Sequence, residues 1–195
     1  MTNRTNFKVG IIAEDNSDVD SIKILIKRIT NKNNFTFKKF AGKGCGNIIK
    51  KSNTWSRILK QQGCSYLILI HDRDTNDNEL LHKKISNSLE PCPIKNHIIS
   101  IPIEELEAWL LSDSEAIKKV FSLNKFPKID NKPYMIQSPK EYLDKLIYST
   151  TKGEKIYLNT EHNQKISEVI SIEKIKEKNP SFVPLYDFII KFFCN

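Results

Sequence analysis

Acidic side chains follow three apolar segments of this sequence, each at the point where the apolar residues stop. They are Glu14 and Asp18 after Phe7–Ala13, Asp72 and Asp74 after Tyr66–Ile70, and Glu104, Glu105 and Glu107 after His97–Ile103. Carboxylates that share a site raise one another's pKa unless a cation compensates their charge. If the chain brings the three groups together, the pattern predicts a metal site.

The residue types around these acids indicate which metal would bind. The four cysteines have no CxxC spacing, and no histidine stands at a zinc-finger interval from them. Carboxylate oxygens without Cys or His ligands favour Mg²⁺, Mn²⁺ or Ca²⁺ over zinc. Because Mg²⁺ keeps several waters and often binds phosphate substrates, we expect Mg²⁺ or Mn²⁺ and phosphoryl chemistry.

The elements that must position the acids alternate along the chain. Short apolar segments rich in β-branched residues predict strands, and apolar residues at helical spacing predict helices between them. The predicted strands are Phe7–Ala13, Phe35–Phe40, Tyr66–Ile70 and His97–Ile103, and the predicted helices begin at Ser17 and cover 48–59, 79–89 and 104–111. This alternation predicts an α/β fold with a Rossmann-like, mostly parallel sheet flanked by helices. Ligands of such sheets bind beyond the carboxyl ends of the strands, where the acids stand.

The pattern is less regular after Phe121. We expect an α/β catalytic core at residues 1–121 and, at 122–195, a loop and a helical C-terminal extension that packs on the core. A segment rich in Lys, Asn and Pro at 125–139 predicts the loop, and helices are expected at 139–148, near Ile172 and at 183–193. Trp109 has the spacing of a core residue relative to Leu106 and Leu110, so we expect it to be buried.

Charge favours a polyanionic partner. The 195 residues include 31 basic and 23 acidic side chains, which leaves a formal charge of +8 and favours nucleic acid through phosphate neutralisation. The glycine-rich loop at 42–46 exposes backbone N–H groups, so Lys43 within it is a candidate phosphate contact, as is Lys155. No apolar segment approaches the ~20 residues that span a bilayer, so we expect a cytoplasmic protein with no membrane partner.

Several motifs resemble those of a known superfamily. The sequence AEDNSD at 13–18 and the sequence HDRD at 71–74 resemble the Glu and Asp-x-Asp motifs of Toprim domains. Within that superfamily, ELEAWLLSD at 105–113 is similar to the EIEAWLLAD-type signature of an uncharacterised bacterial family. The likeness extends to the 42–46 loop and to NPSF at 179–182. This chain has Asp15 where Toprim motifs usually have a glycine that forms a compact turn, and it lacks the glycine that often follows Asp-x-Asp.

The resemblance implies a relative of the overcoming-lysogenization-defect (OLD) nucleases, in which such carboxylates bind two metals and hydrolyse phosphodiesters. It implies metal ligands at Glu14, Asp18, Asp72 and Asp74, and a further ligand or an orienting role at Glu105 and Glu107, with a weaker match at Glu104. Catalytic roles would then fall to Glu14, Asp72, Asp74, Glu105 and Glu107, with Mg²⁺ or Mn²⁺ as cofactor. We therefore expect a nuclease for DNA or RNA that belongs to an antiphage defence system.

The resemblance also implies a partner, a separate ABC-type ATPase that controls the nuclease. The segment 182–193 carries an apolar face that either packs on the chain's own sheet or binds such a partner. Assembly as a homo-oligomer is a further possibility.

The same acidic residues are also compatible with other classes of protein. A receiver-like signalling domain would be phosphorylated on Asp72, but it needs a lysine after a fifth strand. A haloacid-dehalogenase-like phosphatase usually places its Asp-x-Asp after the first strand. A third alternative is a catalytically silent module that binds nucleic acid or a partner.

Overall fold

A computed structural model describes residues 6–42 and 45–194. Its centre is one sheet, in which all the neighbouring strands run parallel. The strands are β1 (Phe7–Ala13), β2 (Phe35–Ala41), β3 (Tyr66–Ile70) and β4 (Asn96–Ser100), in the spatial order β2-β1-β3-β4. The predicted α/β class with a parallel sheet is therefore confirmed.

The strand register brings the carboxyl ends of the strands to one edge. Ile12 of β1 pairs with Leu69 of β3, and Leu69 pairs with Ile99 of β4, so the chain leaves all three strands at about the same level. The chain runs from β1 to β2 on one side and from β3 to β4 on the other, which makes the gap between β1 and β3 the point where strand order reverses. Ligands of open α/β sheets bind at such a point.

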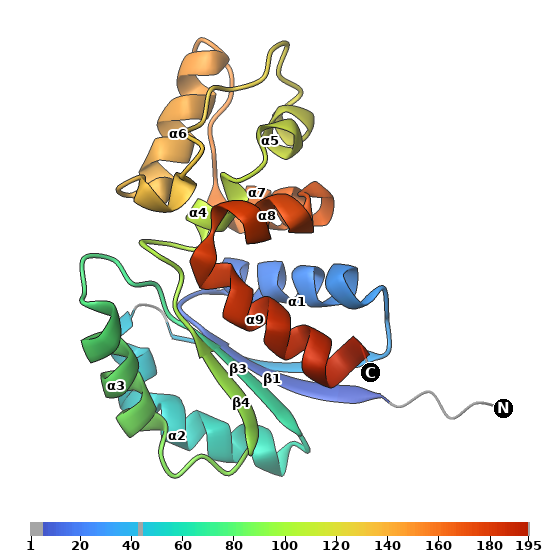
Figure 1. The fold of residues 1–195 in the computed structure, drawn as a ribbon, viewed down its shortest axis with the longest axis vertical. Helices are drawn as coiled ribbons and strands as arrows, with labels where there is room; N and C mark the ends of the chain where they lie inside the picture. The colour runs from blue at the N-terminus through green and yellow to red at the C-terminus, as the bar shows by residue number, and fades with distance from the viewer. Residues whose placement is uncertain (1–5, 43–44, 195) are drawn as a thin grey trace, which may run out of the picture.

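Helices cover both faces of the sheet (Figure 1). Helix α1 (Asn16–Thr30) and helix α9 (Val183–Ile189) lie on one face, and helices α2 (Cys45–Gln61) and α3 (Asn78–Leu89) lie on the other. Two apolar clusters result, one on each face. Gly10 of β1 lets α2 approach closely, because a Cβ at this position would lie 2.9 Å from the Cδ1 atom of Leu59.

A group of smaller helices lies beyond the carboxyl edge of the sheet (Figure 1). They are α4 (Glu107–Leu110), α5 (Ser114–Phe121), α6 (Pro139–Thr150), α7 (Asn159–Val169) and α8 (Ile172–Lys178). A 3₁₀ turn at Pro133–Met135 precedes α6, and another at Pro180–Phe182 lies between α8 and α9. Helix α7 packs on α1, and residues from both sides of position 121 share the larger apolar cluster. The division at 121 stays a prediction.

The structure corrects several details of the predicted elements. Strand β4 ends at Ser100 rather than Ile103, since Pro102 has no N–H to continue a ladder. The following helix begins at Glu107 rather than Glu104, because Glu104 has a left-handed φ of 61°. Helix α5 was not predicted; its N-terminal signal is Asp113, whose side chain accepts a hydrogen bond from the Glu115 N–H.

The C-terminal segment packs on the sheet instead of presenting a free apolar face. Phe182, Leu185 and Phe188 belong to the larger apolar cluster, and α9 contacts both α1 and β4. A π-helical turn at Ile190–Cys194 continues the helix and buries Phe193. Trp109 is fully buried, as predicted. In the part of the chain that the structure describes, no helix has the length and apolar character to cross a membrane.

Candidate functional site

The first acids stand where β1 passes into α1. Asp15, in extended geometry with φ −138°, caps α1 by accepting hydrogen bonds from the N–H groups of Ser17 and Asp18. The Asp18 carboxylate in turn accepts the Asp15 N–H at 3.3 Å. A capping box of this kind needs no left-handed residue, so Asp15 replaces the usual glycine without strain. The cap is Asp15, and it holds Asp18 in the first turn of α1.

The segment after β3 contacts the segment after β1 directly. Glu14 Oε1 accepts the backbone N–H of Asp72 at 3.2 Å, and His71 Nδ1 lies 3.3 Å from the same oxygen. His71 is buried, and its Nδ1 also contacts the Asp72 carbonyl at 2.7 Å. The two central strands therefore bring Glu14 and Asp72 together, at the point where strand order reverses.

The segment after β4 completes the arrangement. Asp72 Oδ1 accepts the backbone N–H of Leu106 at 3.0 Å. Asp74 and Glu104 both have left-handed φ values, 49° and 61°, and the Asp74 N–H donates to the Glu104 carbonyl at 3.0 Å. The left-handed turn is thus at Asp74 itself, which explains how the chain turns without the glycine that often follows Asp-x-Asp. Asp74 is exposed at the rim.

Glu107 is buried and lies at the start of α4. Its Oε1 accepts hydrogen bonds from Tyr157 Oη at 2.9 Å and from Asn163 Nδ2 at 3.1 Å, and Tyr157 Oη also contacts Asn163 Oδ1. Both partners are buried. The sequence offered no signal for these two neutral residues, because they come from the chain around α7, distant in sequence and without a charge pattern.

Glu105 is oriented by a helix terminus. Its Oε2 accepts the backbone N–H of Lys140 at 2.8 Å, in the first turn of α6. Burial raises the pKa of Glu105 to about 7, against the lowering effect of the Lys140 N–H. A carboxyl group with this pKa can both accept and donate a proton near neutral pH.

The acids raise one another's pKa values across the three segments. Burial raises the pKa of Asp72 well above its usual value, and the charges of Asp18, Glu107, Glu14 and Glu105 raise it further. The pKa of Asp18 is likewise well raised, first by burial and then by the charge of Asp15 and of Glu107. Burial also raises the pKa of Glu14, although the His71 ring opposes this. The electrostatic coupling runs through all three strand ends.

The acids of the cluster share one pattern of hydrogen bonding. In each of Glu14, Asp18, Asp72, Glu105 and Glu107, one carboxylate oxygen accepts a hydrogen bond from the chain. The second oxygen of each acid has no hydrogen-bond partner among the described residues. None of these oxygens is fully buried, so each keeps some contact with solvent. Oriented carboxylates with one available oxygen are typical of metal ligands held by surrounding hydrogen bonds.

The cluster is not a closed metal cage. Within residues 6–42 and 45–194, no group of three or more Asp, Glu, His or Cys side chains is arranged to hold a metal ion. Mg²⁺ commonly uses one or two protein carboxylates together with waters and substrate phosphates, so an open set of acids is compatible with it.

Of the two lysines predicted to contact phosphate, the structure describes only Lys155. Lys43 lies outside the described residues. Lys155 directs its ammonium to the carbonyl oxygen of Phe121 at the end of α5, which gives this lysine a structural contact. An ammonium has two further N–H donors, so the assignment of Lys155 to phosphate stays a prediction.

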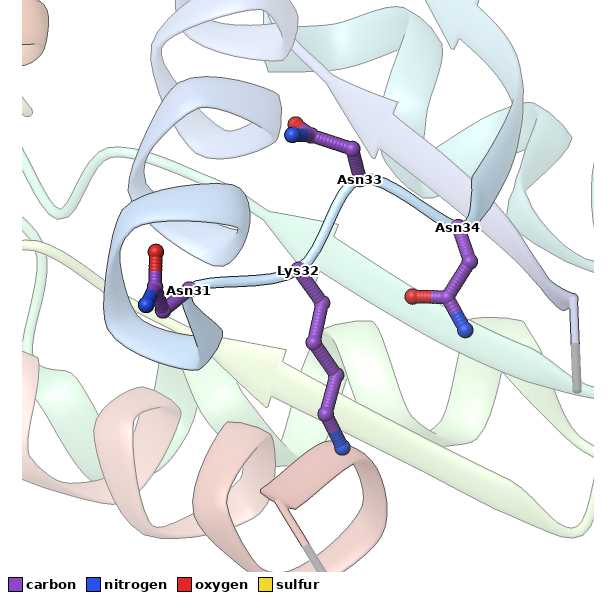
Figure 2. A pocket seen from close by; sticks show the side chains of 4 residues that line it. All are labelled: Asn31, Lys32, Asn33 and Asn34. Atoms are coloured by element: carbon purple, nitrogen blue, oxygen red, sulfur yellow. The ribbon is translucent and has the colours of Figure 1, made fainter. Parts of the chain in front are cut away.

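A surface pocket formed by residues 31–34 lies at the opposite edge of the sheet (Figure 2). These residues come just before β2, so they stand at the amino end of the strands. Lys32 points from this loop to the C-terminal segment, where its Nζ donates to the Phe193 carbonyl at 2.6 Å. The pocket is therefore remote from the acids and is built around a structural contact.

Comparison with known proteins identifies the family. Residues 13–190 match the model of a domain of unknown function (DUF4276), and the chain belongs to this family. No curated protein and no solved structure matches the chain. The matched region includes the acids at all three strand ends.

Proposed function

We propose that the protein is a metal-dependent nuclease that hydrolyses phosphodiester bonds of DNA or RNA with Mg²⁺ or Mn²⁺. The observation that carries this proposal is the set of carboxylates at the strand-order reversal, each with one oxygen held by the chain and one available. Charges gathered this closely are costly without a cation. The formal charge of +8 supports a polyanionic substrate. The resemblance to Toprim and OLD nucleases points to the same chemistry.

Each group of residues has a separate role in this proposal. Glu14, Asp18 and Asp72 would hold the metal, with Asp74 as a ligand at the exposed rim. A bound Mg²⁺ ion would supply charge neutralisation at the phosphate and a water of lowered pKa. Tyr157 and Asn163 orient Glu107. Glu105, with a pKa of about 7, is placed to hold or accept a proton beside the cluster.

The rival classes receive less support. A receiver domain needs a fifth strand followed by a lysine, whereas among the described residues β4 is followed by helices. The Asp-x-Asp motif follows β3, while a haloacid-dehalogenase-like phosphatase usually has it after the first strand. A silent binding module remains the second candidate, because Lys155 is engaged elsewhere and no finished metal cage is formed among the described residues.

The cytoplasmic location, the defence role and control by an ABC-type ATPase are parts of the same proposal. The apolar face of α9 is covered by the sheet and α1, so an ATPase would have to bind another surface. Assembly as a homo-oligomer also stays a prediction, because contacts within one chain do not test it.

Metal binding is the first test. Asp72→Asn keeps an oxygen to accept the Leu106 N–H but removes the charge. We expect calorimetry to show Mn²⁺ affinity more than about 100-fold weaker than in the wild type, since loss of an orienting partner alone costs 10–100-fold. Glu168→Gln, an exposed acid on α7, is the matched control and should bind Mn²⁺ normally. Equal affinity in Asp72→Asn and wild type would show that the metal site is misassigned.

Cleavage is the second test, with single-stranded and duplex DNA and RNA as substrates. We expect cleavage that requires Mg²⁺ or Mn²⁺, stops in chelator and is lost in Asp72→Asn. Binding without metal should weaken as salt rises, because phosphate contacts release counterions. Metal and nucleic-acid binding without cleavage, also in the presence of the ATPase, would favour the silent module.

A further inference from the structure

The basic charge of the chain is concentrated in the segment that carries α5 and α6, the helices that stand furthest from the sheet (Figure 1). Residues 118–155 contain nine lysines and four acids, which is a formal charge of +5 out of the +8 of the whole chain. Among the described residues, none of these nine lysines forms an ion pair with a carboxylate. In the next two helices, by contrast, Lys165, Lys174 and Lys176 are each paired with an acid. The segment 118–155 therefore carries positive charge that the chain itself does not neutralise.

A cavity of about 460 Å³ lies between the loop after α5 and the loop after α6. Its lining includes three lysines and one acid, which are Lys125, Lys152, Lys155 and Glu154. Both helices end at this cavity, and helix C-termini carry partial negative charge. Lys155 offsets that charge at α5, where its ammonium donates to the Phe121 carbonyl. Lys125 and Lys152 are exposed, and their ammonium groups have no hydrogen-bond or ion-pair partner among the described residues, so both can bind an external anion.

A second cavity, of about 370 Å³, adjoins the first, because Ser122 and Leu123 line both. Phe126 lines the second cavity and is 59% exposed, although Lys118 Nζ lies over its ring, 4.3 Å from the centroid. Lys125 lines the first cavity, so two consecutive residues present an ammonium and an exposed aromatic ring to adjoining spaces. We call the two cavities together the lysine groove.

Two short stretches of chain connect the lysine groove to the carboxylate cluster. Tyr157, which donates to Glu107, comes two residues after Lys155. Helix α6 starts where the Lys140 N–H donates to Glu105 and ends at the first cavity, after a rise of about 15 Å at 1.5 Å per residue. A polymer that lies in the groove can therefore extend to the acids, whereas a single phosphate would fill only part of one cavity.

The chemistry of the lysine groove fits single-stranded nucleic acid. Lysines without partners suit the phosphates that repeat along a strand, and an exposed aromatic ring suits a base that is not stacked in a duplex. A duplex hides the faces of its bases, so it would leave the Phe126 ring without a partner. An acidic peptide would bind the lysines but has no general need of the ring.

We propose that the lysine groove binds a single strand of DNA or RNA and leads it to the carboxylate cluster. Phosphates of the strand lie against Lys125 and Lys152, and one base stacks on Phe126. The inference rests on the proposed function for the fate of the strand, because the carboxylates would cut what the groove holds. It also narrows the substrate of that function from nucleic acid in general to its single-stranded form.

The test uses fluorescence anisotropy of the full chain in chelator. The probes are labelled oligothymidylate and oligouridylate of about 16 nucleotides, the upper end of the sites that small single-strand-binding domains cover, and a duplex of the same length. The lysine variant carries Lys125→Gln and Lys152→Gln together. Its affinity for the single strands should fall at least about fivefold at low salt. The slope of log affinity against log salt should fall by about 1.4, since each phosphate contact of a single strand contributes about 0.7.

The matched control for the lysines is a variant with Lys83→Gln and Lys84→Gln. It removes the same charge from two exposed lysines of α3 and should bind both single strands as the wild type does.

The aromatic ring is tested separately. Phe126→Ala should weaken binding of the single strands at least about fivefold, as for other bases stacked on aromatic side chains. The salt slope should stay constant, because a stacked base releases no counterions. Leu80→Ala, at a side chain of α3 that is 70% exposed, is the control and should not change the affinity. All the substituted side chains are exposed or half-buried at the surface, so each variant should keep the fold.

The outcomes separate this inference from the proposed function, because the assay needs neither metal nor cleavage. Unchanged affinity in the Lys125 and Lys152 variant, or an equal loss in the Lys83 and Lys84 variant, would overturn the lysine groove even if the chain proves to be a nuclease. Unchanged affinity in Phe126→Ala, or equally tight binding of the duplex, would also overturn it. Losses in both groove variants and in neither control support the groove even if cleavage is never detected, and the tighter-binding single strand then identifies DNA or RNA.

Discussion

The two edges of the same sheet are built in opposite ways. At the amino edge, Phe7, Phe35 and Tyr66 begin three strands, and the Phe193 ring lies 5.3, 5.4 and 4.9 Å from theirs, between ring centroids. At the carboxyl edge, β1, β3 and β4 lead into acids, with burial and mutual repulsion raising the pKa of Asp72 and of Asp18. One edge is closed by aromatic packing, and the other gathers charge.

The difference shows which edge of the sheet stabilises the folded protein and which edge carries an energetic cost. Aromatic pairs contribute through buried area and ring geometry without any need for a ligand. Buried carboxylates destabilise the folded protein until a proton or a cation neutralises them. Packing at the amino edge therefore offsets the cost of the buried acids at the carboxyl edge. Mutations at the amino edge should lower the free energy of unfolding, whereas mutations at the carboxyl edge should lower the proposed Mn²⁺ affinity.

The largest effect is expected from a mutation at the amino edge. Phe193→Ala should lower the free energy of unfolding by about 3–5 kcal/mol, because it removes the ring that packs against four others. Chemical denaturation measures the change, with Phe126→Ala as the control, since Phe126 is 59% exposed. The folded fraction should still bind Mn²⁺ with the affinity of the wild type. A loss below about 1 kcal/mol would mean that the aromatic cluster does not hold the amino edge.

A smaller effect is expected from a neutral residue at the carboxyl edge. Tyr157→Phe removes the hydroxyl that orients Glu107, so Mn²⁺ affinity should fall about tenfold, as for other partners of metal ligands. Tyr148→Phe, at a side chain that is 57% exposed, should leave the affinity unchanged. Calorimetry compares the two. If Tyr157→Phe binds Mn²⁺ as tightly as the wild type, Glu107 takes no part in the metal site.

The smallest effect is a pH dependence. The pKa of Glu105 is raised from 4.5 to about 7, so the folded protein binds a proton more tightly than the unfolded chain does. The stability that this proton contributes is present below pH 4.5 and is lost as the pH rises to about 7. The midpoint temperature of the metal-free protein should therefore fall by a few degrees over this range, on the order of 2–4 °C per kcal/mol.

Differential scanning fluorimetry between these pH values checks this slope, and the control is Glu105→Gln. The variant should show a shallower fall, with the remaining slope coming from Asp72, Asp18 and Glu14, whose pKa values are also raised. Saturating Mn²⁺ should counter the fall at neutral pH. A midpoint that rises with pH in the metal-free wild type would contradict the raised pKa values.

Much of the sheet could be predicted from the sequence, because a buried parallel strand has a local signature. Phe7–Ala13 and Tyr66–Ile70 were predicted with the bounds that the structure has. The positions of the acids after the strands followed from the same signature. The structure brings Glu14 and Asp72 into contact, while their role as metal ligands stays a prediction.

The rest of the site could not be predicted, for physical reasons that differ from residue to residue. Tyr157 and Asn163 contact Glu107 through tertiary packing of the chain around α7. Neither the type nor the spacing of such neutral residues in the sequence predicts this contact. The helix expected from Glu104 fails because that residue takes a left-handed φ, which hydrogen bonding to Asp74 stabilises. The charge of Lys155 gives no information about the carbonyl that its ammonium contacts, and its role at phosphate stays a prediction.

The contact between Phe193 and Phe7 has a consequence for the order of events during synthesis. Chains are made from the amino terminus, at roughly 5–20 residues per second, and domains fold as units when their parts are available. The first strand of this protein meets its aromatic partner only when the segment at Ile190–Cys194 has been made. The acids of β1 and β3 are translated early, but we expect the sheet beneath them to become stable last. A growing chain on the ribosome would thus carry every proposed metal ligand before the sheet that positions these residues is stable.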